Sequence, residues 1–386
     1  MRSFSIAIVF GACIALAAVS AQAADFTIMD NTDHPVAKPC NPKSMSCQLD
    51  TAITSWMADN TIPAAQLAVR KDGKLILSHA YTLAGQGYPP VLTKNVFRLA
   101  SISKMLETAY YSQQVSAGHL TGNELVFPYL GITAPLLPSQ TPDPRINDIT
   151  VSELVAHTSG MPGEGDGDPL FEMRDIEVEL GSEPLTEQQF AEYLYGVPLL
   201  SNPGQDYLYS NVGYFLLQMV LEKASNQEYF SYVTEELLKP LKMTNWSLSP
   251  TLHTKVSPNE IAADDPYTGP SVFDISPDAP LEPFNFEGGD IIWELTKGPS
   301  DMVTNANSVS DFIHTWCVWC LALPDGRVYD YARDGCIPGA STWAESLNAD
   351  IDFSILFNSQ PCLGFSSTVI EQVRSILGSL DKPIAP

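Results

Sequence analysis

The sequence predicts an α/β (α+β) fold, with an antiparallel sheet built from both ends of the chain and a mainly helical lobe inserted between them. Strand patterns cluster near the two ends of the 386-residue chain, whereas the middle, about residues 120–260, is typical of helices and loops. The predicted α/β part covers about residues 49–105 and 296–386, and the helical lobe about residues 106–295. A protein with two such lobes is expected to hold its site in the cleft between them.

The first 23 residues have the layout of a secretory signal peptide. Arg2 precedes an apolar run from Ile6 to Val19, and Ala21-Gln22-Ala23 places small residues at the cleavage positions. We expect cleavage after Ala23, a periplasmic or secreted protein, and no stable membrane span once the signal is removed. An uncleaved N-terminal anchor is the alternative, although the apolar run is short for a membrane span.

The cysteine count supports an exported protein. Of the seven cysteines, Cys13 would leave with the signal, and an even number in an exported chain suggests disulfides. Cys40–Cys47 is the most economical local pair. Cys317-x-x-Cys320 could be half of a zinc site or a redox pair, but no second such motif or close histidine pair completes a zinc set. We therefore expect no metal there.

The charge balance excludes one large class of partners. The chain has 20 Lys and Arg against 45 Asp and Glu, a formal net charge of −25. Nucleic-acid binding requires surplus basic residues, so no nucleic acid is expected as a partner. A hydrophobic content of 45% also argues against intrinsic disorder.

The elements after the signal follow from periodicity and turn residues. Residues 24–48 are predicted to be an extended, disulfide-pinned leader, and Leu49 to Asn60 a helix with apolar residues on one side. Ala65 to Ala80 is predicted to be a β-hairpin that turns at Asp72-Gly73. Ile102 to Ser116 has apolar residues at helical spacing and is predicted to be a helix.

The second half of the chain returns from helix to strand. Val212 to Lys223 is apolar nearly all round and predicts a buried helix. Six prolines between Pro258 and Pro283 indicate a long irregular loop, of the kind that often forms the rim of a site. Ile351, Phe353, Ile355 and Phe357 place an apolar residue at every second position, which predicts a strand, and a helix is expected at about 366–379.

The most informative local motif is Ser101-Ile102-Ser103-Lys104. At the start of a helix, Ser101 and Lys104 are three residues apart and share one face. A serine hydroxyl needs a base to become a good nucleophile, and a lysine is such a base only when burial lowers its pKa. The motif alone occurs often by chance.

Further motifs follow this one in order. They are Ile149-Thr150-Val151-Ser152-Glu153-Leu154, then His157-Thr158-Ser159-Gly160-Met161-Pro162, then the stretch from Pro203-Gly204 to Tyr209-Ser210-Asn211-Val212-Gly213-Tyr214. Together they resemble the serine β-lactamase and penicillin-binding-protein superfamily, in its class C β-lactamase, D-alanyl-D-alanine carboxypeptidase and esterase branch. The resemblance runs from about Ala52 to Leu380 and implies a β-lactamase/transpeptidase-like fold.

The resemblance also implies a role for each matching residue. Ser101 would attack a carbonyl and become acylated, and Lys104 would accept or relay its proton. Tyr209 would act as the partner base and protonate the leaving group, and Asn211 would orient the substrate amide and Lys104. This set of groups requires no cofactor and no histidine.

The third element departs from the family pattern. Arg333-Asp334-Gly335 stands where the branch normally has Lys-Thr-Gly or His-x-Gly, so Arg333 is expected to bind a substrate carboxylate and Gly335 to leave room for the substrate. The oxyanion hole would use the backbone N–H groups of Ser101 and Cys336, each worth roughly 3–4 kcal/mol. If Cys336 forms a disulfide, Cys362 is its most plausible partner. The alternative is that this strand is only structural and that catalysis is impaired.

Three other site interpretations are less favoured. His157 could pair with a serine, but in the family this stretch is structural, and no G-x-S-x-G motif supports an α/β-hydrolase. The acidic run from Glu164 to Asp168 alternates as a calcium loop does, but Pro169 and the lack of a closing Glu break that template. A solvated loop at the edge of the cleft is the expectation for this run.

The sequence therefore predicts an exported serine hydrolase that acts through an acyl-enzyme on Ser101. A D-amino-acid peptide, an ester or a β-lactam would be the small-molecule or peptide substrate. Two alternatives remain: a catalytically impaired binding protein on the same fold, and a metal-dependent hydrolase. The oligomeric state is left open.

Overall fold

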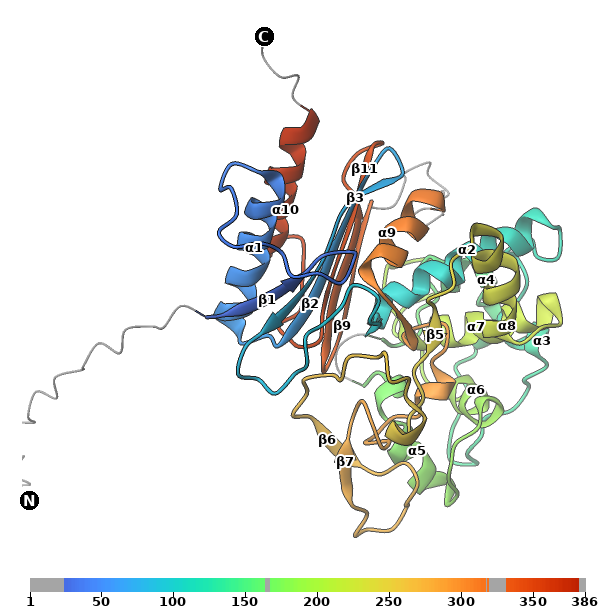
Figure 1. Ribbon diagram of the computed structural model, residues 1–386. Helices are drawn as coiled ribbons and strands as arrows, with labels where there is room; N and C mark the ends of the chain where they lie inside the picture. The colour runs from blue at the N-terminus through green and yellow to red at the C-terminus, as the bar shows by residue number, and fades with distance from the viewer. Residues whose placement is uncertain (1–23, 164–166, 317, 319–330, 382–386) are drawn as a thin grey trace, which may run out of the picture.

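The computed structural model describes residues 24–163, 167–316, 318 and 331–381, and these form an α/β lobe beside a mainly helical one (Figure 1). The predicted signal peptide and the Cys317/Cys320 pair lie outside the described residues. The centre of the α/β lobe is a six-stranded antiparallel sheet in the order β1-β3-β2-β11-β10-β9. Its strands are β1 (Phe26–Met29), β2 (Ala64–Lys71), β3 (Lys74–Leu83), β9 (Ala332–Ile337), β10 (Ala340–Ser346) and β11 (Ile351–Phe357).

The sheet is assembled from both ends of the chain, as predicted. β2 and β3 form the expected hairpin around Asp72-Gly73, and β2 then pairs with β11, with Val69 opposite Phe353. This one pairing joins the N-terminal and C-terminal strands into a single sheet. The predicted strand Ile351–Phe357 has the predicted bounds.

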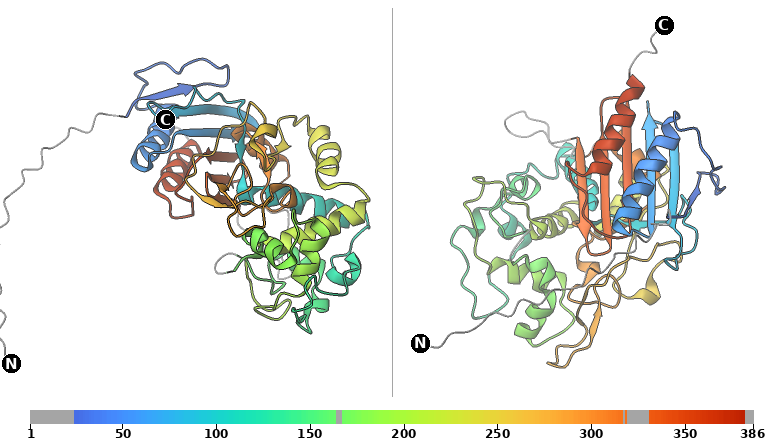
Figure 2. Two further views of the ribbon diagram at one scale, coloured as in Figure 1. Left: turned by 90° about the horizontal axis from the view of Figure 1, so that it is seen from below. Right: turned by 90° about the vertical axis from the view of Figure 1, so that its left-hand side faces the viewer.

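Alternate residues of β2 face opposite sides of the sheet, which follows from the twofold side-chain period of a strand. Leu67 and Val69 pack into one apolar cluster, and Ala64 and Ala68 into the other. Helices α1 (Met45–Asn60) and α10 (Thr368–Gly378) lie side by side over the first face, and α9 (Ala306–Thr315) covers the second (Figure 2). Each face is thereby shielded from water.

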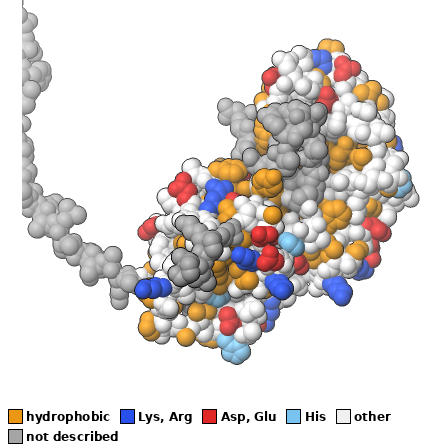
Figure 3. Space-filling view, turned by 90° about the horizontal axis from the view of Figure 1, so that it is seen from above, with side chains coloured by type: hydrophobic (Ala, Val, Ile, Leu, Met, Phe, Trp, Pro, Cys, Tyr) orange, Lys and Arg blue, Asp and Glu red, His pale blue; other side chains and the backbone are white. Residues whose placement is uncertain are grey.

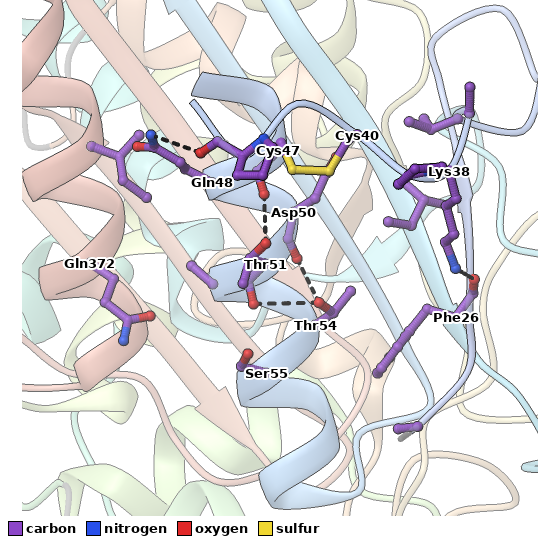
Figure 4. Close-up of a pocket in the computed structure, with 18 of the residues that line it drawn as sticks. Phe26, Lys38, Cys40, Cys47, Gln48, Asp50, Thr51, Thr54, Ser55 and Gln372 are labelled. Carbon is purple, nitrogen blue, oxygen red and sulfur yellow. Dashed lines mark hydrogen bonds between the residues drawn. A yellow bond between two sulfur atoms is a disulfide. The ribbon is translucent and has the colours of Figure 1, made fainter. Parts of the chain in front are cut away.

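The leader differs from the prediction. Phe26–Met29 is not merely extended but forms β1, which pairs with the end of β3 and makes it an inner strand. The predicted helix from Leu49 begins earlier, at Met45, because Ser44 caps it by accepting a hydrogen bond from the Cys47 backbone N–H at 3.3 Å. The predicted Cys40–Cys47 disulfide is present beside this cap (Figure 4).

A groove of about 1090 Å³ lies between this leader and helices α1 and α10 (Figure 4). Helices α1 and α10, which contribute to the lining of this groove, lie on the side of the sheet away from the helical lobe (Figure 1). Within the described residues, no helix combines the length and apolarity that a membrane crossing requires. On the face drawn in Figure 3, acidic and basic side chains are interspersed over the atoms that are not grey.

The second lobe consists of helices joined by long loops. The α-helices are α2 (Lys104–Ser116), α3 (Val126–Leu130), α4 (Val151–Val155), α5 (Met173–Leu180), α6 (Glu187–Tyr195), α7 (Asn211–Ser225) and α8 (Tyr229–Tyr232), followed by a π-helical turn (Val233–Leu238). Short 3₁₀ turns lie at Ala100–Ser103, Ile146–Asp148, Pro169–Phe171, Lys239–Leu241, His253–Lys255, Trp293–Leu295 and Ser379–Asp381. The predicted buried helix is α7, which packs against α2, α4 and α3.

Two small sheets complete the fold. Strands β4 (Phe97–Arg98), β8 (Met302–Thr304) and β5 (Ser247–Leu248) form one, and β6 (Thr268–Pro270) and β7 (Leu281–Pro283) form the other. The β6–β7 pair lies within the predicted irregular loop, which otherwise has no regular strand or helix. Because β4 leads directly into the Ala100–Ser103 turn, the first of these sheets positions Ser101.

Candidate active site

Ser101 lies on the tight turn between β4 and α2. The predicted helix from Ile102 begins here as a 3₁₀ turn, Ala100–Ser103, and continues as α2 from Lys104. Ala100 has a φ of +49°, in the left-handed region that is uncommon for any residue but glycine. Backbone strain of this kind is concentrated at functional sites. The turn leaves Ser101 partly exposed while Lys104 is fully buried.

Lys104 contacts three oxygens. Its Nζ lies 3.2 Å from Ser101 Oγ, 2.8 Å from Asn211 Oδ1 and 2.9 Å from the Pro299 carbonyl oxygen. Burial lowers the pKa of Lys104, and the nearby Arg333 cation lowers it further. A neutral amine has two N–H donors and one lone pair. With Asn211 and Pro299 accepting the two N–H groups, the lone pair is directed at the Ser101 hydroxyl, as a base requires.

Tyr209 completes the contacts of the nucleophile. Its hydroxyl donates to Ser101 Oγ at 2.8 Å, and Lys104 Nζ lies 5.0 Å from the centre of its ring. Burial alone would raise the pKa of Tyr209, but the protonated form of Lys104, the Arg333 cation and the hydrogen bonds of Tyr209 hold that pKa below the usual value. The structure therefore brings together the predicted nucleophile and both predicted bases.

Asn211 is the first residue of α7, whose N-terminus is capped by Ser210 Oγ accepting from the Gly213 N–H at 3.0 Å. While its Oδ1 accepts from Lys104, its Nδ2 donates to Asp168 Oδ2 at 2.7 Å. The two bonds fix which way the amide of Asn211 points. Asn211 thus contacts Lys104, as predicted, but its N–H₂ group is already bound to a carboxylate.

Asp168 is a site residue that the sequence reasoning missed. It was expected to belong to a solvated loop at the edge of the cleft, but it is 5% exposed, and its side chain caps the Pro169–Phe171 turn by accepting from the Leu170 N–H at 3.0 Å. The prediction was wrong for this residue because Pro169 starts a helical turn that folds Asp168 inward. Residues 164–166 of the run lie outside the described part of the chain. Asp168-Pro169, an N-cap followed by proline, was the available signal.

Strand β9 carries the altered third element. Arg333 and Gly335 share one side of the strand, as their spacing requires. Arg333 is 3% exposed and its guanidinium lies 5.8 Å from the centre of the Tyr214 ring. Arg333 is not among the described residues that line the pocket at Ser101, and its expected contact with a substrate carboxylate stays a prediction.

Gly335 lets β9 approach the nucleophile. A Cβ atom there would lie 2.4 Å from the Leu99 carbonyl oxygen and 3.0 Å from the Ser101 backbone nitrogen. Thr342 on β10 binds the same carbonyl group, because its Oγ1 donates a hydrogen bond to the Leu99 carbonyl oxygen at 2.8 Å. Cys336 points to the other side and forms the predicted disulfide with Cys362. Any larger residue at 335 would push the strand away from Ser101.

His157 is buried among aromatic rings, 4.4 Å from the ring centre of Tyr209 and 4.7 Å from that of Tyr214. Its Nδ1 accepts a hydrogen bond from the Ser210 backbone N–H at 3.1 Å. Burial lowers the pKa of His157 well below its usual value, so the ring is neutral. These contacts fit the structural role expected of this histidine.

Glu107 is a second residue that the sequence did not single out. It lies one turn beyond Lys104 on α2, is fully buried, and sits so close to Gly298 that a Cβ atom there would come within 2.5 Å of Glu107 Oε2. Burial raises the pKa of Glu107 well above its usual value, although the Lys104 and Arg333 cations oppose this. The sequence gives no signal for this residue, because most glutamates in helices are exposed to water.

A pocket of about 120 Å³ opens at Ser101, between residues of both lobes. Its described lining consists of Ser101, Asp168, Phe171, Tyr209, Asn211, Ser300, Cys336 and Ile337. The two residues predicted to supply the oxyanion hole, Ser101 and Cys336, are both in this set. The arrangement can activate a serine, accept and return its proton, and hold a small group beside it.

A comparison with protein families and curated proteins gives consistent matches. The Beta-lactamase family model matches residues 49–289, well over half of the chain. A putative D-alanyl-D-alanine carboxypeptidase of Escherichia coli O157:H7 is 28% identical over 228 residues, which cover 56% of this chain and 50% of that protein. Protein flp of Staphylococcus aureus NCTC 8325 is 27% identical over 216 residues, covering 53% and 38%. The chain spans about half the length, or less, of these curated relatives.

Solved structures show the same fold. A class C β-lactamase superimposes with a TM-score of 0.62 at 18% identity, covering 90% of this chain and 99% of that one. An octameric penicillin-binding protein homologue from Pyrococcus abyssi gives 0.59 at 17% identity, covering 86% and 76%. A D-stereospecific amidohydrolase from Streptomyces gives 0.55 at 19%, covering 81% and 94%. At these identities the likeness concerns the fold alone.

Proposed function

Given that the chain belongs to the Beta-lactamase family of serine hydrolases, we propose that it cleaves an amide or ester bond of a small substrate through an acyl-enzyme on Ser101. One observation carries the proposal. Ser101 Oγ lies within hydrogen-bond distance of both Lys104 Nζ, at 3.2 Å, and Tyr209 Oη, at 2.8 Å. A serine held between two groups that can take its proton is the arrangement that nucleophilic catalysis needs.

In the first half of the reaction, neutral Lys104 takes the hydroxyl proton as Ser101 Oγ attacks the substrate carbonyl carbon. The carbonyl oxygen gains a negative charge, which backbone N–H groups of Ser101 and Cys336 would stabilise by roughly 3–4 kcal/mol per donor. The leaving amine or alkoxide receives a proton from Tyr209, which regains one from Lys104. Protons therefore balance without an external acid.

In the second half, water attacks the acyl-enzyme. Neutral Lys104 takes one proton from that water and returns it to Ser101 Oγ, which leaves as the hydroxyl. Asn211 keeps Lys104 in place in both halves through its 2.8 Å hydrogen bond. The buried position of Lys104 keeps its pKa low enough to act as a base.

An exported location is part of the proposal. The Cys40–Cys47 and Cys336–Cys362 disulfides are compatible with an oxidising compartment. The signal-like residues 1–23 point in the same direction. We place the protein in the periplasm or outside the cell.

The second candidate is a binding protein on the same fold with impaired catalysis. The replacement of the usual Lys or His by Arg333 motivates it, since arginine cannot donate a proton near neutral pH. Against it, a protein that only binds has no need for a buried lysine aimed at a serine. The missing Lys or His also makes amidase or esterase activity a better proposal than efficient β-lactamase activity.

A fluorophosphonate probe and p-nitrophenyl propionate test the proposal. Wild-type protein should be labelled and should hydrolyse the ester, and Ser101→Ala should do neither. Ser116→Ala, which changes an exposed serine on the same helix α2, should behave as wild type. Labelling that persists in Ser101→Ala would remove Ser101 as the nucleophile, and unlabelled, inactive wild-type protein would favour the binding protein.

A further inference from the structure

The groove between the leader and helices α1 and α10 is separate from the site at Ser101. Its volume is about 1090 Å³, whereas the pocket at Ser101 has about 120 Å³, and the described linings of the two share no residue. Pockets that hold drug-sized ligands have volumes of roughly 300–1,000 Å³. The groove is therefore large enough to hold a ligand of its own.

The leader, which forms one wall of the groove, is held at several points. The Cys40–Cys47 disulfide ties it to α1 (Figure 4). Lys38 Nζ donates a hydrogen bond to the carbonyl oxygen of Phe26 on β1 and lies 3.7 Å from Asp25 Oδ1. Because these contacts already order the wall, a ligand that enters the groove has little chain to immobilise.

Much of the lining is apolar. Phe26 and Ile28 contribute from β1, Val36 and Pro39 from the leader, and Ile376 from α10. These residues come from three separate elements that lie around one opening (Figure 4). A ligand with an apolar chain or ring system would remove part of this surface from water, which favours binding.

A buried carboxylate, Asp50, also lines the groove. Among the described lining residues, Lys38 and Asp50 are the ones with formally charged side chains, and Asp50 is 4% exposed. Its Oδ1 accepts from the Tyr81 hydroxyl at 2.9 Å and lies 2.7 Å from His79 Nδ1. Its Oδ2 has no hydrogen bond within the described part of the chain and is not enclosed by protein, so it remains accessible from the groove.

Two hydroxyl groups of α1 add acceptors to the same wall. Thr51 Oγ1 donates to the Cys47 carbonyl oxygen at 2.7 Å, and Thr54 Oγ1 donates to the Asp50 carbonyl oxygen at 2.7 Å (Figure 4). A hydroxyl group has one hydrogen to donate, so each of these oxygens can only accept from a ligand. An ammonium group, which has three donors and no acceptor, fits such a wall, whereas a carboxylate does not.

We propose that the groove is a second binding site, and that it takes an amphipathic amine, a molecule with an apolar chain or ring system and one ammonium group. The ammonium group binds Asp50 Oδ2, because a carboxylate with little access to water is stabilised by a cation that pairs with it. The apolar part packs against β1 and the leader. The net charge of −25 draws cations toward the protein. The proposal does not depend on the chemistry at Ser101.

The test compares three probes that share one apolar chain and differ in the group at its end. Binding of n-octylamine, n-octanol and octanoate to the wild-type protein is measured by calorimetry at neutral pH, where the amine is a cation and the acid an anion. A hydrogen bond between charged groups is expected to favour the amine over the alcohol by about tenfold or more. Octanoate should bind more weakly than octanol, because Asp50 repels it.

Two variants place the binding in the groove. Asp50→Asn removes the charge but keeps an oxygen that accepts from Tyr81, and it should abolish the preference for octylamine over octanol. Thr51→Trp fills the groove from an exposed position on α1 and should weaken both probes. Asp59→Asn, a charge removal at an exposed position on α1 that does not line the groove, should bind as wild type. Thermal unfolding checks that each variant is folded.

Each outcome decides the proposal. A preference for octylamine that Asp50→Asn removes and Asp59→Asn keeps supports it. If Asp50→Asn does not fold, weaker octylamine binding in Thr51→Trp together with the preference of the wild-type protein supports it instead. No binding of octylamine, equal affinities for amine and alcohol, or octylamine binding that Thr51→Trp leaves unchanged would overturn it.

Discussion

Replacing Tyr209 with phenylalanine removes one hydroxyl from the environment of Ser101. In the structure that hydroxyl donates to Ser101 Oγ at 2.8 Å, while Lys104 Nζ lies 3.2 Å from the same atom. The ring of Tyr209 also packs 4.4 Å from that of His157, and this contact remains in the variant. The substitution therefore tests the proton transfer with little change in packing.

The expected loss follows from the role of that hydroxyl. Positioned general acid–base groups contribute about 10²–10⁴-fold to a rate, which corresponds to about 2.7–5.4 kcal/mol in the activation free energy. Lys104 stays in place in Tyr209→Phe, held by Asn211 and Pro299, and can still take the serine proton. We therefore expect the loss to appear mainly in protonation of the leaving group, and to be larger for an anilide than for a p-nitrophenyl ester.

The assay is kcat/KM for p-nitrophenyl propionate and for alanine p-nitroanilide, with Tyr207→Phe as the matched control. Tyr207 is 54% exposed and lies two residues away on the same loop. Tyr207→Phe should keep its activity. If Tyr209→Phe retains more than a fifth of wild-type activity on both substrates, the hydroxyl is not the proton donor and Lys104 alone must serve as base and acid.

Three further predictions concern charge and stability. Because the Arg333 cation disfavours protonation of Lys104, Arg333→Met should raise the pKa of Lys104 and move the acid limb of the pH profile of kcat/KM to higher pH. Arg333→Lys keeps the charge and should not move it. Identical pH profiles for Arg333→Met and wild-type protein would contradict this. Replacing Cys336 and Cys362 together by serine should lower the free energy of unfolding in urea by ~3.5 kcal/mol, from the sequence separation of 26, and a loss under 1 kcal/mol would refute the estimate. Burial raises the pKa of Glu177 from 4.5 to about 7, so the stability linked to its protonation is full below about pH 4.5 and is lost as the pH rises through 7. The urea concentration at the midpoint of unfolding should accordingly fall more between pH 5 and pH 8 in the wild-type protein than in Glu177→Gln. An equal decrease in both proteins would show that Glu177 does not cause the loss of stability.

The strands and helices could be predicted from the sequence where a single segment contains a clear turn signal or a regular spacing of apolar residues. The hairpin around Asp72-Gly73 has a turn signal and alternating apolar residues, and in the strand Ile351–Phe357 every second residue from Ile351 is apolar. β1, Phe26–Met29, was missed because four residues give no reliable period, and its pairing with β3 is a tertiary contact.

The site was predictable only in part, for a similar reason. Ser101, Lys104, Tyr209 and Asn211 lie in motifs with fixed spacing, and the structure brings them together. Burial, by contrast, cannot be deduced from residue type. Asp168 was expected to face water, and this expectation was wrong because its side chain turns inward; Arg333 is also buried, which its residue type does not predict.

The pairing of β2 with β11 has a consequence for the time at which the protein becomes active. Contacts between distant parts of a chain make folding slow, because the intervening loop must close before they can form. Cys336, on β9, also reaches the serine turn only after the C-terminal strands have joined the sheet. We therefore expect a growing chain to carry its predicted nucleophile, Ser101, without a formed pocket. Such a chain would be hydrolytically silent until its last strands have folded.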